Sequence, residues 1–141
     1  MAQYDGLQAG TLNVRWVAKL SGMYQLPWGF STGAFLNTRQ GFPFYREVRT
    51  PSRAGGIGTA DVDVYPFTTE RYPNLTLVDW RIDKRIALPG GTRIDLVATV
   101  FNVLNSSTVL SRFRRQEAST ANDVQEVLAP RVINLQARFV F

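Results

Sequence analysis

The sequence predicts an all-β fold, for two reasons. Apolar residues recur at every second position in most apolar segments, which is the period of a strand and not of a helix. Tight turns containing Pro and Gly alternate with long polar connections along the chain. Apolar residues make up 45% of the 141 residues, so the composition is not that of a disordered chain.

The first predicted hairpin joins strands near 12–26 and 30–42. In the first strand, alternate positions are apolar or aromatic, and the positions between them are mostly polar. The apolar set is Val14, Trp16, Ala18, Leu20, Gly22, Tyr24 and Leu26. A tight turn at Pro27-Trp28-Gly29 follows, because Pro and Gly provide the φ values that such turns need. The second strand repeats the alternation more weakly, with Phe30, Ala34 and Leu36 on one face.

The second predicted hairpin joins strands near 75–88 and 92–104, with a tight turn at Pro89-Gly90-Gly91. The apolar faces carry Val78, Trp80, Ile82, Ile86 and Leu88 in one strand and Ile94, Leu96, Ala98 and Val100 in the other. The opposite face of the first of these strands alternates acid and base through Asp79, Arg81, Asp83 and Arg85, and such pairs neutralise each other on a sheet face. Lys84 shares the apolar face, and we expect its long side chain to reach the edge of the apolar zone.

A fifth strand is predicted at 131–141, where Ile133, Leu135, Ala137, Phe139 and Phe141 alternate with polar residues. The long polar connections cover residues 43–74 and 105–130. The order is therefore strand, short turn, strand, long loop, repeated, and this layout is typical of bacterial outer-membrane barrels. The predicted strands also reach the roughly nine to eleven residues that a tilted spanning strand needs.

Aromatic residues lie where the interface girdles of such a barrel would be. The predicted interface aromatics are Trp16, Tyr24, Trp28 and Trp80. Five strands cannot close a barrel, because the smallest bacterial ones use about eight. The fold class that we predict is an antiparallel meander of about five long transmembrane strands, forming a segment of a large outer-membrane β-barrel.

Composition excludes several kinds of site. The chain has no Cys and no His, so thiolate and imidazole metal ligands and the commonest general base are missing. We expect no metal, no cofactor and no enzymatic activity, since carboxylate alternation along a strand is more often a salt-bridge ladder than an acid–base pair. The net charge is +5, but the nearest basic cluster is Arg112-Phe113-Arg114-Arg115, so we expect no nucleic-acid binding. The first residues show no signal peptide, so we expect a cytosolic protein or a segment of a longer one.

Several motifs together resemble TonB-dependent outer-membrane receptors, specifically the Oar-like members with a carboxypeptidase-regulatory-like front domain. The similar stretches are Trp16–Gly29, Asn37–Phe44, Asp79–Arg85, Phe101–Asn105 and Pro130–Phe141. Each motif is weakly specific, but their order and spacing cover most of residues 12–141. The resemblance implies a barrel of ~22 strands with a plugged lumen, of which this chain would supply the last five.

The resemblance also implies a location, partners and a role for the final strand. The location would be the bacterial cell outer membrane, and the partners would be its lipid, the barrel-insertion machinery and the remainder of the receptor barrel and plug. Asn134, Phe139 and Phe141 fit the family's assembly signal, whereas Gln136 stands where Gly is usual. The charged inner-wall residues and the two long loops would face water, plug or an unknown substrate.

An alternative remains open at this point. A soluble β-rich ligand-binding module, with an apolar ligand in a half-barrel, would show the same alternation. The two hypotheses differ in whether the chain needs detergent to stay in solution.

Overall fold

A computed structural model describes residues 14–52, 58–64 and 70–141, and they divide into two units. One unit holds the five long strands, and we call it the sheet unit: residues 17–39, 75–107 and 129–141. The other holds Val14–Trp16 together with the described parts of 40–74 and 108–128, and we call it the loop unit. Each unit is described separately below.

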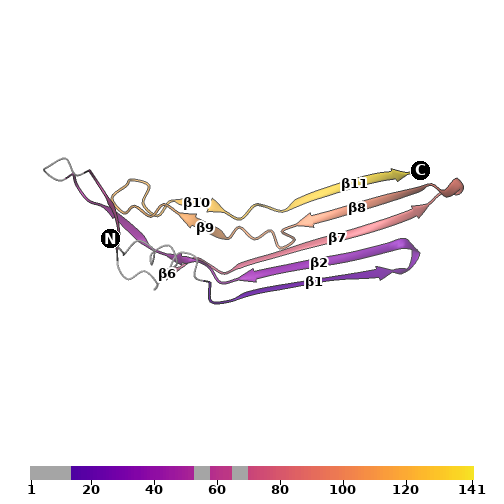
Figure 1. The fold of residues 1–141 in the computed structure, drawn as a ribbon, viewed down its shortest axis with the longest axis horizontal. Coiled ribbons are helices and arrows are strands. Elements are labelled where there is room, and N and C mark those ends of the chain that lie inside the picture. Colours follow the sequence, from indigo (N-terminus) through magenta and orange to yellow (C-terminus); the bar gives the residue numbers. More distant parts are fainter. Residues whose placement is uncertain (1–13, 53–57, 65–69) are drawn as a thin grey trace. The chain divides into compact units, whose positions relative to one another are not determined.

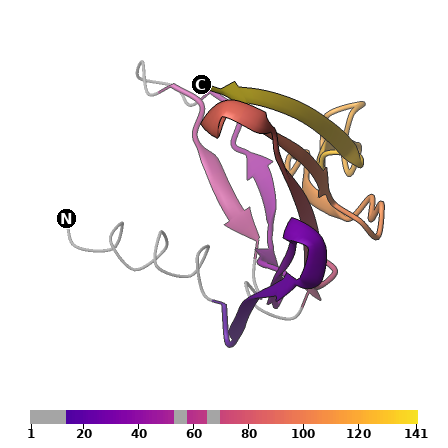
Figure 2. The same ribbon diagram turned by 90° about the vertical axis from the view of Figure 1, so that its right-hand side faces the viewer.

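The sheet unit confirms the all-β prediction and its five-stranded antiparallel sheet (Figure 1). Its strands are β1 (Val17–Leu26), β2 (Phe30–Arg39), β7 (Leu75–Ala87), β8 (Arg93–Phe101) and β11 (Val132–Val140). They pair in the order β1-β2-β7-β8-β11, so neighbours in the sheet follow one another among the long strands of the chain. The end-on view in Figure 2 shows an open sheet, with β1 and β11 at its two edges.

The long strands differ a little in length from the prediction. β1 begins at Val17 although the alternation starts earlier, and residues 12 and 13 of the predicted range lie outside the described residues. β2 ends at Arg39 and β8 at Phe101, a few residues before the predicted bounds. The strands contain 9 to 13 residues, which suffices to cross a bilayer when tilted.

The two tight turns have the same backbone plan. Each is a three-residue turn that begins with Pro, η1 (Pro27–Gly29) and η2 (Pro89–Gly91), and in each the second and third residues have positive φ. Gly90 occupies the middle position of η2, where φ is +81°, but Trp28 occupies it in η1, where φ is +61°. Gly29 is required at the third position, since a Cβ there would lie 2.6 Å from the carbonyl oxygen of Arg85.

The loop unit contains six short strands that the sequence prediction did not include. They are β3 (Pro43–Phe44), β4 (Arg46–Arg49), β5 (Asp61–Val64), β6 (Glu70–Arg71), β9 (Val109–Arg112) and β10 (Val124–Val127). They form three two-stranded antiparallel pairs, β3 with β6, β4 with β5 and β9 with β10. The connections predicted as long polar loops therefore carry regular structure of their own.

Candidate functional site

The register of the five strands brings their predicted apolar faces onto one side of the sheet. Each row of laterally paired residues runs across several strands, such as Gly22–Ala34–Trp80–Val100–Ile133. The next row is Tyr24–Thr32–Ile82–Ala98–Leu135, and the one after is Leu26–Phe30–Lys84–Leu96–Ala137. Side chains along a strand point alternately to the two faces of the sheet. The pairing register therefore determines which residues of the five strands share a face.

This apolar face is exposed. Leu20 is 69% exposed and Leu135 is 76% exposed. Among the described residues only Gly41, Pro43, Leu75 and Asn102 are buried, so almost no apolar side chain is enclosed by the chain itself. Exposed apolar patches of this extent mark surfaces that another protein or a membrane covers.

The opposite face of the sheet carries most of the charged residues of the strands, with apolar residues such as Met23 and Phe35 between them. The Arg81 guanidinium donates to both carboxylate oxygens of Asp83, with the shortest contact at 2.6 Å. Asp95 on β8 lies laterally between Arg85 on β7 and Arg138 on β11. Its two oxygens lie 3.5 Å from Arg85 Nε and 3.4 Å from Arg93 Nε, respectively. A hollow of about 610 Å³ at the turn end of the sheet is lined by several of these groups.

Trp80 lies in the middle of the sheet and not at its ends. It pairs laterally with Ala34 and Val100, and its indole Nε1–H donates to Thr32 Oγ1 at 2.7 Å. The hydroxyl of Thr32 in turn donates to the backbone carbonyl of Arg81 at 3.2 Å. A satisfied indole N–H can face an apolar medium, so this Trp does not need the headgroup level to find a polar partner.

Other predicted interface aromatics lie near the strand ends. Tyr24 is on the apolar face two residues before the end of β1, and Trp28 is 83% exposed at the tip of η1. Trp16 directly precedes β1, and its carbonyl accepts the amide of Gln40 at 3.2 Å.

Trp28 has a φ of +61°. A bulky residue at positive φ carries backbone strain of order 1–3 kcal/mol, and such strain concentrates at functional positions. Trp28 is therefore a stronger candidate for an anchoring role than Trp80.

Lys84 extends its amine to the turn η1 at the end of the strands. Its Nζ donates to the backbone carbonyl of Trp28 at 2.5 Å and lies 4.0 Å from the centroid of the Phe30 ring. The positive charge thus reaches the turn at the end of the strands, and the stem covers the apolar surface. This geometry agrees with the expectation that the side chain extends towards the edge of the apolar zone.

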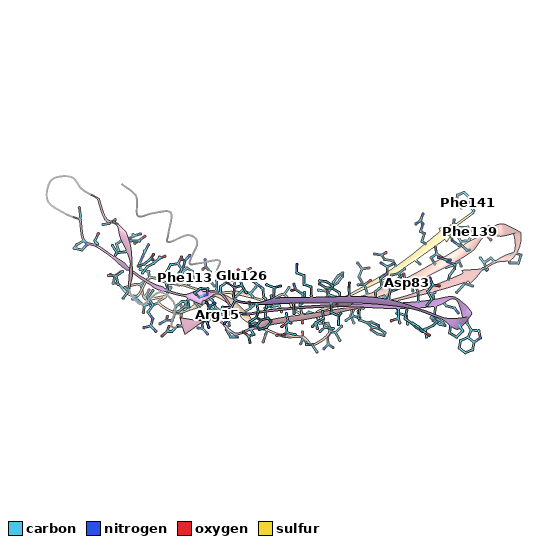
Figure 3. All side chains as sticks on the ribbon, turned by 60° about the horizontal axis from the view of Figure 1, so that its bottom comes forward. Arg15, Asp83, Phe113, Glu126, Phe139 and Phe141 are labelled. Carbon is cyan, nitrogen blue, oxygen red and sulfur yellow. The ribbon has the colours of Figure 1, made fainter. Side chains whose placement is uncertain are left out.

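The predicted assembly-signal residues all belong to β11 and the residue that follows it. Asn134 lies on the polar face opposite Thr99, and Phe139 lies on the apolar face opposite Ile94. Phe141 follows the strand and is 97% exposed. The Phe139 and Phe141 rings have centroids 6.1 Å apart, and both lie at the turn end of the sheet (Figure 3). β11 is also an edge strand, with one side of its backbone unpaired in the sheet.

Asn102 connects the segment after β8 to the segment before β11 by hydrogen bonds. The sequence alone did not predict this role. Asn102 is 2% exposed, with φ +51°, and its backbone amide donates to Asp79 Oδ1 at 2.9 Å. Its side-chain amide donates to the carbonyls of Ser106 and Ala129, and its Oδ1 accepts the amide of Ser106. An Asn next to a strand end tolerates positive φ, but sequence alone does not show that it is buried.

Within the loop unit, the two long connections are bonded to each other. The amide of Glu47 donates to the carbonyl of Arg114, and the amide of Gln116 donates to the carbonyl of Glu47, both at 3.0 Å. The amide of Arg49 donates to both carboxylate oxygens of Glu117. Arg114 reaches the Tyr45 ring and hydroxyl. These bonds join segments far apart in the sequence into one compact unit.

The charges of the loop unit are largely paired. Asp61 accepts from Arg49 at 2.8 Å and lies 3.5 Å from Arg115. The hydrogen bond from Arg49 holds the pKa of Asp61 below its usual value. Burial, together with the Asp63 and Asp61 carboxylates, raises the pKa of Glu47 even though Arg114 lies 3.3 Å away. Arg114 and Arg115 of the basic cluster therefore form ion pairs within this unit.

A hollow of about 410 Å³ lies within the loop unit. Its lining includes three arginines and two aromatic rings, from Phe44, Arg46, Arg71, Tyr72 and Arg112. The rings of Phe44 and Tyr72 meet edge to face with centroids 5.4 Å apart, and burial raises the pKa of the Tyr72 phenol. This hollow was not predicted, because its residues come from β3, β4, β6, β9 and the segments next to them, whose pairing the sequence did not indicate.

The described residues contain neither a membrane-spanning helix nor a cluster of acidic metal ligands. None of the helices found there is both long enough and apolar enough to span a membrane. No group of three or more Asp or Glu side chains in the described part of the chain is placed to hold a metal ion.

Comparison of the chain with protein-family models, with curated proteins and with solved structures finds no match.

Proposed function

We propose that this chain is the carboxy-terminal part of an outer-membrane TonB-dependent receptor. It would contribute five strands of barrel wall, two long loops on the outer side and the assembly signal at its end. The partners would be outer-membrane lipid, the barrel-insertion machinery and the remaining barrel and plug. The motifs that resemble this family span most of residues 12–141, and the organisation of the sheet is compatible with that role.

The observation that carries the proposal is the exposed apolar face. Five strands of spanning length, whose apolar side chains gather on one face with almost no core beneath them, suit contact with hydrocarbon. The other face carries Arg–Asp pairs that suit a wetted inner wall. Open edges in hydrocarbon would leave backbone groups unpaired at several kcal/mol each, so β1 and β11 require further strands.

The test is partition of the 141-residue chain between buffer and detergent, with circular dichroism to measure β structure. We expect a β signal only in detergent or lipid vesicles, because the apolar face needs cover. A folded, monodisperse protein in plain buffer would overturn the proposal.

The assembly role has its own test in the full-length receptor. Phe141→Ala should slow insertion into the membrane, since the terminal aromatic ring would be missing. Phe113→Ala, an exposed aromatic of the loop unit, is the matched control and should insert at the normal rate. Normal insertion of Phe141→Ala would remove the assembly role.

A soluble β-rich ligand-binding module is the second candidate. A shallow hollow of about 400 Å³ on the apolar face favours it, lined by Phe30, Ile82, Leu96, Ala98, Leu135 and Ala137. The partition experiment separates the two, because only the module would stay folded and monodisperse without detergent.

A further inference from the structure

The hollow in the loop unit has the composition of a small-molecule site. Its volume of about 410 Å³ lies in the roughly 300–1,000 Å³ range of ligand pockets. Apolar surface comes from Phe44 and Tyr72, whose edge-to-face contact fixes the position of both rings. Charge comes from Arg46, Arg71 and Arg112, with one carboxylate, Glu70, on the same wall. The formal charge of these groups is therefore positive.

Short backbone pairing holds these side chains together. β3 pairs with β6, which sets Phe44 opposite Glu70, and the amide of Tyr72 donates to the carbonyl of Phe42 at 2.9 Å. The amide of Arg112 donates to the Tyr72 hydroxyl at 2.9 Å. The phenol thus joins β9 to the segment after β6. A phenol is protonated at neutral pH, so Tyr72 has a hydrogen that it can donate to an acceptor in the hollow.

The contact between Arg46 and Glu70 shows that an arginine of this hollow binds a carboxylate. Arg46 Nη2 contacts both carboxylate oxygens of Glu70, at 3.0 and 3.2 Å. Both side chains are about half exposed, and exposed ion pairs of this kind contribute little to stability. A carboxylate from outside can therefore take the place of Glu70 at small cost. Arg112 donates to the carbonyl of Asn122 through Nη1, and a guanidinium has five N–H donors.

We propose that this hollow binds a small ligand that carries a carboxylate on an apolar ring. The carboxylate would lie against Arg46 and Arg112, because a guanidinium fork matches a carboxylate in two parallel hydrogen bonds. The apolar ring would lie against Phe44 and Tyr72. The inference deepens the proposed function, on which it rests for the outward direction of the loops, and it gives the receptor's substrate a chemical class.

Benzoate is the probe, titrated into the full 141-residue chain in a non-ionic detergent and followed by calorimetry and by NMR of the arginine Nε–H groups. We expect benzoate to bind, to shift the Arg46 and Arg112 signals, and to bind more weakly at high salt. Benzyl alcohol and inorganic phosphate should bind at least fivefold more weakly, since one lacks the charge and the other lacks the ring. Absent benzoate binding, or equal binding of benzyl alcohol or phosphate, would overturn the proposal.

Three variants test whether benzoate binds in the hollow of the loop unit. Arg112→Gln should weaken benzoate binding about tenfold, because a hydrogen bond to a charged group is lost. Glu70→Gln should strengthen binding several-fold, since the competing internal carboxylate is removed. Arg93→Gln changes the charge equally but lies in the sheet unit, and it should leave the affinity unchanged. Equal effects of Arg112→Gln and Arg93→Gln, or weaker binding in Glu70→Gln, would overturn the site.

The outcome is separable from that of the partition experiment. A chain that folds in plain buffer and binds benzoate through Arg112 would remove the membrane role and keep the site. A chain that folds only in detergent and does not bind benzoate would remove the site and keep the membrane role.

Discussion

The sheet unit and the loop unit are both β structure, but different interactions define them. In the sheet unit, five long strands run in continuous register, and backbone pairing fixes which side chains share a face. In the loop unit the strands have two or four residues, β9–β10 contains register shifts, and side-chain bonds such as Arg49–Asp61 join segments far apart in sequence. The first unit exposes an apolar surface, and the second exposes paired charges around a hollow. A substitution should therefore act differently in the two units.

The largest effect should come from a charge on the apolar face. Leu135→Asp should lower the free energy of unfolding in lipid vesicles by about 2–3 kcal/mol, because a carboxylate would face hydrocarbon. Urea titration in vesicles measures the effect, with Gln136→Asp on the polar face as the neighbouring control. Equal losses for the two variants would mean that the faces are assigned incorrectly, and no loss for Leu135→Asp would mean that water covers this face.

Removing the buried side-chain amide at the base of the second loop should have the next largest effect. Asn102→Ala should cost about 2 kcal/mol, because the three part-buried hydrogen bonds from the buried Asn102 side chain to Ser106 and Ala129 would be lost. Asn105→Ala is the matched control: Asn105 also has positive φ and bonds the amide of Arg131, but it is exposed. Similar unfolding free energies for the two variants would contradict this role of burial.

The two turns allow a substitution that should stabilise the sheet. Trp28→Gly should raise the free energy of unfolding by about 1 kcal/mol in detergent, because Gly accepts the positive φ without strain. In η2 the reverse change, Gly90→Ala, should lower it by a similar amount. Urea titration of both variants tests this pair. A loss of stability in Trp28→Gly would show that contacts of the indole outweigh the backbone strain.

The smallest effects should come from the pH dependence of the loop unit. The pKa of Asp61 lies below 3.8 when folded, so its contribution to stability is present above that pH and is lost as pH falls through the lowered pKa. The pKa of Glu47 lies above 4.5 when folded, so its protonated form favours the folded state, and that contribution is lost as pH rises through the raised pKa. Carboxyl ¹³C NMR titration of the full chain should place the two midpoints on opposite sides of their usual values. A midpoint for Asp61 above 3.8 would contradict its hydrogen bond with Arg49, and a midpoint for Glu47 below 4.5 would contradict its burial beside Asp63 and Asp61.

The sheet unit was predictable because its signal is local. Alternation over nine or more residues gives both the strand and its apolar face, and Pro with Gly marks η1 and η2. The short strands of the loop unit were missed because two to four residues are too few for a period to show. Their pairing depends on partners such as Arg114 for Glu47, which lie far away in the sequence. The bond from Trp80 to Thr32 could not be predicted, because it depends on the register between β2 and β7.

The hydrogen bonds around Asn102 determine how much the second long loop can vary in sequence and length. Asn102 bonds Ser106 and Ala129, while Arg131 donates its backbone amide to Asn105 Oδ1 and its guanidinium to the carbonyl of Val103, so the base of the second loop is closed within the sheet unit itself. The spacing between β8 and β11 is therefore set before the chain enters residues 108–128. Segments of other lengths and sequences can be grafted onto that base while the register of β8 with β11 is preserved. The segment 108–128 can thus change in length and sequence, in evolution or by design, while the pairing of the sheet stays the same.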